Sequence, residues 1–329
     1  MIRPQERTCF VSLCLLGASL LLINARSLSA AEEVKVTTYT YKKVGDLEIK
    51  LDVHRVADEK LRPVVVWIHG GALIMGHRAG ISGRVKKAAL ERGCALVSID
   101  YRLAPETKLP EIIADVEDAF GWIHKQGPTQ AKLDTSHVVV SGGSAGGYLT
   151  LLVGHRVKPR PDALVAFWGY GSLVAPWYSE PSPHRRHQGA KGLSRAEIDK
   201  EVSGPPISDS RKRKGNGGRF YQYCRQHGIW PKAVSGWDPK TEEAKYVPYM
   251  PVRNVTKDYP PTFLFHGTED TDVPYYESVG MAREFKKHGV PHVLFAVEGG
   301  EHGLGGGDPK RIDEGYERAL DFVLEHVQD

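Results

Sequence analysis

Hydrophobic and polar residues alternate near the beginning of the chain. In residues 34–44 (VKVTTYTYKKV) and 46–56 (DLEIKLDVHRV) the two-residue period is typical of strands. Gly45 and Asp46 lie at the junction, and both residue types favour turns. The pattern therefore predicts an antiparallel hairpin as the first element.

Further along the chain, short and fully apolar runs take the place of the alternation. These runs are PVVVWIHGG, CALVSIDYRL, HVVVSGG, ALVAFWGY, PTFLFHGT and HVLFAVEGG. Helical patterns lie between them, at SGRVKKAALERG, EIIADVEDAFGWIHKQ, a segment beginning near Ser144, residues 276–288 and residues 309–327. Apolar strands with helices between them predict a parallel sheet that is covered on both faces.

The rhythm stops between residues 174 and 259, which are rich in Pro, Gly, Arg and aromatic residues. The stretch is too long for a plain connection in a compact domain. We therefore expect one α/β catalytic domain over residues 34–329, with residues 174–259 inserted late in the sheet as a cap or lid.

The N-terminus has the layout of a secretory signal. Arg3 and Arg7 precede the apolar run FVSLCLLGASLLLI, and small residues follow at 29–31. The run is shorter than the ~20 residues that a membrane span needs. The pattern predicts a signal peptide over residues 1–31, cleavage near Ala31, a secreted or periplasmic protein and no stable membrane insertion after cleavage. A retained single anchor is the alternative.

Composition adds few constraints. Of the 329 residues, 26% are charged and 41% hydrophobic, which fits a chain with a packed core, and the formal charge of +4 gives no reason to expect nucleic acid as a partner. Without the signal, Cys94 and Cys224 are left, and the sequence does not decide whether they pair. His184 and His187 have a spacing seen in metal sites, but no acidic or cysteine partner clusters with them, so no metal is expected.

The glycine cluster VVVSGGSAGGYLT carries the first chemical signal. A dinucleotide-binding fingerprint needs glycine where Ser144 stands, and a phosphate-binding P-loop needs a Gly-Lys-Ser/Thr triplet that is missing from this loop. Gly142-Gly143-Ser144-Ala145-Gly146 instead matches the Gly-x-Ser-x-Gly turn between a strand and a helix. The pattern predicts Ser144 as a nucleophile that needs no cofactor.

A serine nucleophile needs a histidine base and a carboxylate that orients the base. In this setting the partners follow in the order acid, then histidine. Asp270 lies just beyond the strand in FLFHGTEDTDVP, and His302 lies in a glycine-rich loop after the last strand, with Glu269 and Asp272 as competitors for the acidic role. For the oxyanion we expect the N–H group of Ala145 and the earlier strand end at Gly70 and Gly71 as donors.

These motifs resemble those of the α/β-hydrolase superfamily. HGG at 69–71, DYRLAPE at 100–106 and GGSAGG at 142–147 are similar to the hormone-sensitive-lipase-like and carbohydrate-esterase-like branches. HGTEDTDVP at 266–274 is similar to the acid segment of prolyl-oligopeptidase-type members, and its register favours Asp270. The resemblance implies an eight-stranded, mostly parallel sheet, a metal-free Ser-Asp-His triad and esters of small acyl groups as substrates. Because export is predicted and the insertion is rich in aromatic residues, we expect a short acyl ester on a carbohydrate. Ala72 departs from the third glycine that is usual after HGG.

Several alternatives stay open. A peptidase or amidase would use the same triad, and a non-catalytic binding protein would keep the fold alone. Residues 175–261 contain 16 Lys and Arg against 9 Asp and Glu, which favours a solvated loop, with a lid that attracts anionic substrates as the alternative. Six aromatic residues in the same insertion could stack on sugar rings or form a core of the lid: Trp177, Tyr178, Tyr221, Tyr223, Trp230 and Trp237.

Overall fold

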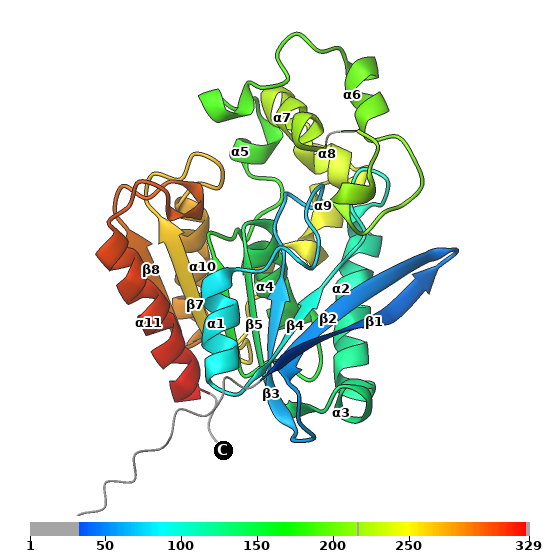
Figure 1. The fold of residues 1–329 in the computed structure, drawn as a ribbon. Coiled ribbons are helices and arrows are strands. Elements are labelled where there is room, and N and C mark those ends of the chain that lie inside the picture. The colour runs from blue at the N-terminus through cyan, green and yellow to red at the C-terminus, as the bar shows by residue number, and fades with distance from the viewer. Residues whose placement is uncertain (1–32, 216, 327–329) are drawn as a thin grey trace, which may run out of the picture. The chain divides into compact units, whose positions relative to one another are not determined.

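Eight strands form one sheet in a computed structural model that describes residues 33–215 and 217–326 (Figure 1). The predicted signal peptide lies outside the described residues. The strand order is β1-β2-β4-β3-β5-β6-β7-β8. The strands are β1 (Val34–Val44), β2 (Leu47–Val56), β3 (Arg62–Ile68), β4 (Ala95–Ile99), β5 (Leu133–Gly143), β6 (Ala163–Phe167), β7 (Thr262–Gly267) and β8 (His292–Val297).

The predicted hairpin and parallel sheet are both confirmed. β1 pairs antiparallel with β2 across a two-residue turn, where Gly45 has a φ of 56° that glycine adopts without strain. β2 is antiparallel to β4, and every pairing from β4 through β8 is parallel. The carboxyl ends of six parallel strands therefore meet at one edge of the sheet.

Helices cover both faces, as the apolar strands predict. α1 (Gly83–Glu91) and α11 (Pro309–His326) lie in front of the sheet in Figure 1, and α2 (Leu109–Lys125), α4 (Ala145–Arg156) and α10 (Tyr276–His288) lie behind it. Alternate strand residues belong to two separate apolar clusters: Val64 and Val66 pack toward α2 and α4, whereas Trp67 packs with the α1 and α11 side chains. The short helix α3 (Gly127–Gln130) precedes β5.

We call the insertion between β6 and β7, residues 174–259, the cap. Its described residues form five short α-helices and four 3-10 helices. The α-helices are α5 (Pro176–Ser179), α6 (Arg195–Glu201), α7 (Gly217–His227), α8 (Trp230–Ser235) and α9 (Glu243–Tyr246). Tyr178 stacks on Trp230 with the ring centroids 3.8 Å apart, and both rings are buried. Tyr221 and Tyr223 are buried as well, so these aromatic residues form the core of the cap and are not exposed platforms for sugars.

The cap is fastened to the sheet domain by polar contacts. The indole of Trp230 donates a hydrogen bond to the carbonyl of Ala72 at 3.0 Å. Arg213, 2% exposed, forms an ion pair with Glu106 at 2.8 Å. The expectation of a solvated basic loop is therefore wrong for Arg213, because a carboxylate from outside the insertion compensates its buried charge.

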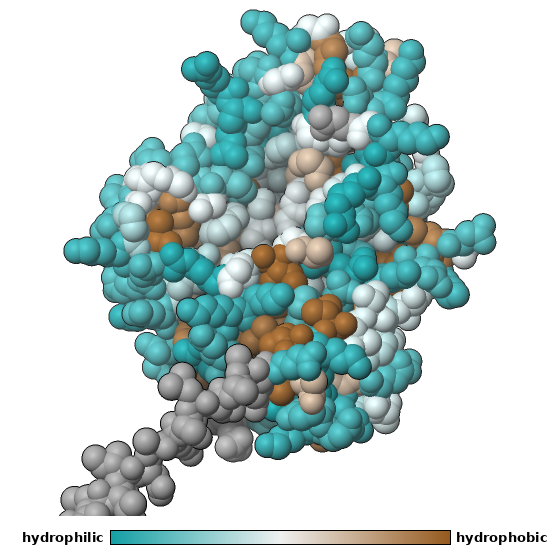
Figure 2. Space-filling view, in the orientation of Figure 1, coloured by the Kyte–Doolittle hydropathy of each residue, from teal (hydrophilic) through white to brown (hydrophobic). Residues whose placement is uncertain are grey.

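The outer surface is mostly hydrophilic on the face shown in Figure 2, with hydrophobic residues in small, separate patches. Among the described residues, no helix has both the length and the apolar character needed to cross a membrane. Cys94 is half-buried, Cys224 is buried, and both are free thiols.

Candidate active site

Ser144 lies on the sharp turn between β5 and α4, with φ at 58° and ψ at −122°. Such a positive φ is costly for a residue with a side chain, and it persists only where the surroundings enforce it. The neighbouring glycines show why side chains are excluded. A Cβ added at Gly142 would lie 2.6 Å from the carbonyl oxygen of Ile68, and one added at Gly146 would overlap that oxygen.

The structure brings the three predicted triad side chains together. His302 lies in the loop after β8, and its Nε2 is 3.1 Å from Ser144 Oγ. Its Nδ1 is 2.7 Å from Oδ2 of Asp270, which lies in the loop after β7. Because a carboxylate only accepts, Nδ1–H donates to Asp270, and Nε2 is left to accept the serine proton.

Asp270 is held ionised by its surroundings. Burial alone would raise its pKa, but hydrogen bonds from His266 and His302 hold the pKa of Asp270 at about 2. Its other oxygen accepts the backbone N–H groups of Asp272 and Val273, both at 2.8 Å. The carboxylate that faces His302 is thus fixed in charge and in direction.

The two competing acids occupy different places. Glu269 is exposed, so it does not have the buried position of an orienting acid. Asp272 lies on the other side of the imidazole, with Oδ2 3.6 Å from Nε2 of His302. Among the described residues, Asp270 is the acid whose carboxylate contacts Nδ1.

The predicted oxyanion segment lies beside the nucleophile. A Cβ added at Gly70 would be 3.2 Å from the Cβ of Ser144, and Gly71 has a φ of 106°. Ala145 is the first residue of α4, where backbone N–H groups have no partner within the helix. These positions would let N–H groups point at an oxyanion, and their assignment as donors stays a prediction.

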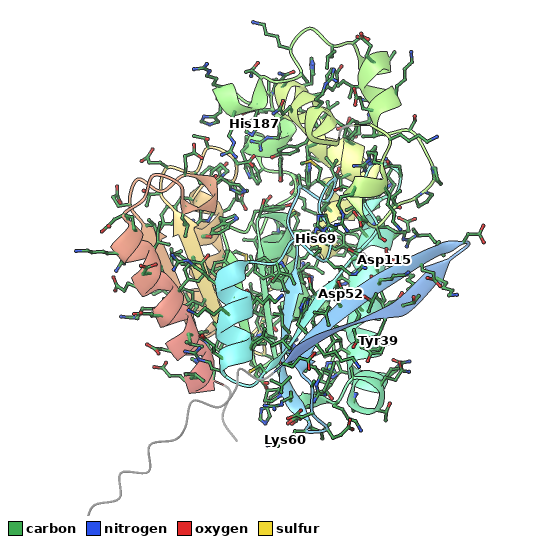
Figure 3. All side chains as sticks on the ribbon, in the orientation of Figure 1. Tyr39, Asp52, Lys60, His69, Asp115 and His187 are labelled. Atoms are coloured by element: carbon green, nitrogen blue, oxygen red, sulfur yellow. The ribbon has the colours of Figure 1, made fainter. Side chains whose placement is uncertain are left out.

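Buried residues brace this segment from behind. Figure 3 labels His69 at the end of β3. His69 stacks on Tyr101 with the ring centroids 4.2 Å apart, and the Tyr101 hydroxyl donates to the His69 carbonyl at 2.9 Å. Arg102 forms an ion pair with the fully buried Asp115 at 2.7 Å. Tyr101 of the DYRLAPE motif therefore braces the predicted oxyanion segment, whereas Arg102 fixes the motif to α2.

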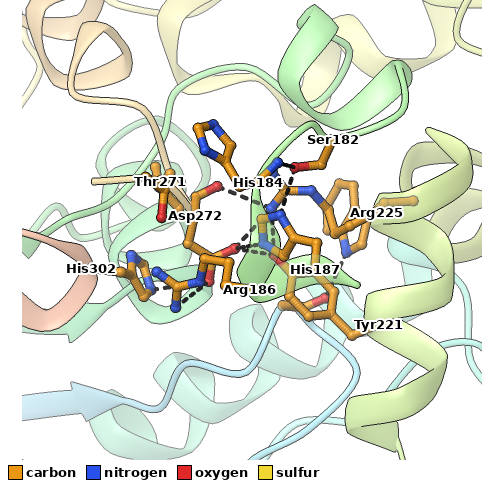
Figure 4. Close-up of polar contacts among 12 residues, drawn as sticks. Ser182, His184, Arg186, His187, Tyr221, Arg225, Thr271, Asp272 and His302 are labelled. Atoms are coloured by element: carbon orange, nitrogen blue, oxygen red, sulfur yellow. Dashed lines mark hydrogen bonds and ion pairs between the residues drawn. The ribbon is translucent and has the colours of Figure 1, made fainter. Parts of the chain in front are cut away.

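Residues of the cap contact Asp272, which lies beside His302 of the predicted triad. Figure 4 shows Asp272 between His302 and Arg186 on one side and His187 and Tyr221 on the other. His187 Nε2 is 2.9 Å from Asp272 Oδ1, and its Nδ1 is 2.6 Å from Ser182 Oγ. In the sequence, Asp272 in the segment DTD was the one signal that indicated a second acid near the site.

An apolar cavity of about 330 Å³ lies elsewhere, between α1, α11 and the sheet. Val139, Val165, Phe167, Ala89 and Tyr316 are among the residues that line it. The described residues around it include none of the predicted site residues, so the cavity is separate from the triad.

Comparisons with known proteins agree with this fold. A family model described as the alpha/beta hydrolase fold matches residues 65–202, and a model of the prolyl oligopeptidase family matches residues 220–329. Among curated proteins, the chain is 26% identical over 340 residues to the non-reducing polyketide synthase Preu3 of Preussia isomera. That match covers 89% of this chain but 13% of the synthase.

Solved structures with similar folds include several esterases. An alpha/beta hydrolase superfamily protein from Enterococcus faecalis has a TM-score of 0.67 at 23% identity, covering 90% of this chain and 100% of that one. Esterase 2 of Thermogutta terrifontis, phosphoramylated by tabun, has a TM-score of 0.62 at 23% identity, covering 88% and 94%. A truncated carbohydrate esterase from gut microbiota has a TM-score of 0.60 at 19% identity, covering 91% and 99%. At these identities the likeness concerns the fold.

Proposed function

The chain belongs to the α/β-hydrolase superfamily, and on that premise we propose that it is a serine hydrolase that cleaves carboxylic esters. One observation carries the proposal: Ser144 Oγ, His302 and Asp270 form a continuous hydrogen-bonded chain. A hydroxyl on a strained turn, backed by an imidazole and an ionised carboxylate, is arranged for attack on an acyl carbon.

In the proposed reaction, Ser144 Oγ bonds to the acyl carbon while its proton passes to Nε2 of His302. Asp270 keeps Nδ1 protonated and stabilises the imidazolium that forms. Backbone N–H groups of Gly70, Gly71 and Ala145 hold the negative charge on the acyl oxygen. The imidazolium then protonates the leaving alcohol. Water next attacks the acyl carbon while one of its protons passes to Nε2, and the imidazolium returns that proton to Ser144 Oγ as the acyl–oxygen bond breaks and the acid leaves.

For the substrate we propose a short acyl ester on a carbohydrate, met outside the cytoplasm. Two observations support this choice. The N-terminal sequence predicts export, and one protein of similar fold is a carbohydrate esterase. In addition, Trp168 lies edge-on to His302 at 6.2 Å and is half-buried, so it offers an apolar surface beside the reacting atoms.

Labelling by a fluorophosphonate tests the nucleophile. We expect the wild type to be labelled and the Ser144→Ala variant to remain unlabelled, with ester hydrolysis reduced by about 10⁴-fold or more. A correctly folded wild type that takes up no label would instead favour the non-catalytic binding protein.

Peptide or amide hydrolysis is the second candidate, because the prolyl oligopeptidase family model matches residues 220–329. Rates on a chain-length series of p-nitrophenyl esters, on acetylated and feruloylated sugars and on aminoacyl anilides separate the candidates. Ester cleavage faster than anilide cleavage is expected. Faster cleavage of the anilides would reverse the assignment.

A further inference from the structure

Asp272 lies where the cap meets the triad. Its side chain is 11% exposed, and it belongs to the loop after β7 that also carries Asp270. Oδ1 accepts three hydrogen bonds from the cap: from His187 at 2.9 Å, from Tyr221 at 2.6 Å and from Arg225 at 2.8 Å. This oxygen is fully used by cap donors.

The second oxygen of Asp272 faces the active site. Oδ2 is 3.6 Å from Nε2 of His302 and 3.5 Å from the guanidinium of Arg186. The distance to Nε2 is beyond a good hydrogen bond, so the interaction with the imidazole is electrostatic at this separation. The nitrogen that takes the serine proton therefore has a second carboxylate beside it.

The cap helps to hold Asp272 ionised. Burial alone would raise its pKa, but the hydrogen bond from His187 and the positive charges of His302, Arg225 and Arg186 hold the pKa of Asp272 well below its usual range. Arg225 is 2% exposed and lies over the rings of Trp177 and Tyr178, so it is itself fixed in the aromatic core of the cap. Cap residues thus fix the position of the negative charge beside Nε2 and contribute to keeping it ionised.

Arg186 and Glu301 complete the charged surroundings of His302. Glu301 accepts the backbone N–H of His302 at 2.8 Å and pairs with Arg186 at 2.8 Å. Glu301 also accepts a hydrogen bond from the hydroxyl of Thr271. The acid loop, the histidine loop and the cap are therefore linked around one imidazole, with Asp270 and its partner His266 on the Nδ1 side.

We propose that Asp272 is a positioning residue for the proposed ester hydrolysis: it stabilises the protonated form of His302, and cap donors hold its carboxylate in place. When Ser144 transfers its proton to Nε2, the new positive charge lies between two carboxylates, Asp270 and Asp272. The proton goes on to the leaving alkoxide as before. The inference rests on the proposed function, because it concerns the same imidazole.

Asp272→Asn tests the inference, since asparagine keeps the size and removes the charge. We expect kcat to fall about tenfold with KM little changed, and the acidic limb of kcat/KM to move to lower pH by about one unit. The direction follows because the imidazolium loses a stabilising charge. Glu269→Gln, an exposed acid of the same loop, is the matched control and should change neither value.

If Asp272 only held the cap in place, its loss would lower stability and activity but would not move the acidic limb. His187→Gln and Tyr221→Phe each remove one cap donor but keep the charge of Asp272. These variants should be less stable, with the acidic limb close to that of the wild type. If Asp272→Asn lowers kcat and leaves the acidic limb in place, as these variants do, the inference is overturned.

Asp272→Asn leaves Arg225 buried without its partner and could fail to fold. The double variant Asp272→Asn/Arg225→Met removes both charges and is compared with Arg225→Met alone. An acidic limb at lower pH in the double variant supports the inference, and coincident limbs overturn it. A wild type that hydrolyses no ester would overturn the proposed function first, so the two failures are distinguishable.

Discussion

The sheet domain and the cap are held together by different interactions. The interior of the sheet domain consists of apolar rows such as Val64, Val66 and Ile68, all 0–2% exposed. The centre of the cap contains a buried cation, Arg225, surrounded by aromatic rings and paired with Asp272 from outside the cap. The first region is stabilised mainly by hydrophobic burial, whereas in the second a buried charge pair adds to the packing of apolar and aromatic side chains.

Because of this difference, changes in the two regions should affect the proposed active site in different ways. An apolar core supports the triad through backbone geometry, since strand ends place Ser144, Asp270 and His302 irrespective of the charge state of the core. The cap acts on the triad through the carboxylate of Asp272. A change in the charges of the cap therefore alters the electrostatic environment of His302. Three substitutions and a change of pH test whether the two regions differ in this way.

The largest effect is expected at the sheet-borne triad. In Asp270→Asn the amide donates where the carboxylate accepts, which favours the wrong tautomer of His302. We expect kcat to fall by about 10⁴-fold. Stopped assays on p-nitrophenyl acetate measure the loss. Glu269→Gln serves as the control, and an equal loss in that variant would mean that the wrong acid has been assigned.

A charge deletion in the cap should cost stability. Arg225→Met leaves Asp272 buried without its main cation, and we expect the free energy of unfolding to fall by about 3–5 kcal/mol. Urea denaturation measures it, with Ile113→Ala in the sheet domain as the apolar reference at about 2–5 kcal/mol. Adding Asp272→Asn to Arg225→Met should recover part of the lost free energy of unfolding, because the unpaired buried charge is removed. Adding Asp272→Asn to Ile113→Ala should recover none of it. Equal behaviour would remove the distinction between the regions.

Lowering the pH should destabilise the fold around His69, at the carboxyl end of β3, before it protonates Asp270 of the predicted triad. Burial lowers the pKa of His69 from 6.5 to about 4, so the folded state favours the neutral ring. This stabilisation is complete above pH 6.5 and is lost as the pH falls toward 4, a change of about 3 kcal/mol. Unfolding of wild type and His69→Asn across this range measures it. Parallel curves would contradict the prediction.

The smallest effect is expected at the surface of the cap. Arg195 and Asp199 pair at 2.7 Å on α6, but both side chains are about half exposed. Arg195→Ala should change the free energy of unfolding by less than about 0.5 kcal/mol, because water competes for exposed charges. A loss as large as that of Arg225→Met would show that burial is not what distinguishes the two arginines.

The sequence predicted the sheet well because its signals are local. The alternation of residues 34–56, the apolar runs and the glycines around Ser144 each reflect constraints within a few residues. Gly142 and Gly146 are required because the backbone of Ile68 crowds them, and their spacing made the turn recognisable. The register of HGTEDTDVP likewise favoured Asp270 over its neighbours, and the geometry at Nδ1 agrees.

The cap could not be predicted in the same way. Its helices span 4 to 11 residues, too short for a clear periodic pattern, and its partners are distant in sequence. Arg225 meets Asp272 47 residues away, and Arg213 meets Glu106 107 residues away. A count of charges therefore suggested a solvated basic segment, although two of its arginines are buried ion-pair partners.

By itself, the sequence determined the class of fold and the order of the three triad residues, because a strand, a tight turn and a helix are specified by neighbouring residues. Only the tertiary structure showed that Asp272 lies beside Nε2 of His302 and pairs with Arg225 of the cap. That pairing depends on burial and charge compensation between segments that are far apart along the chain.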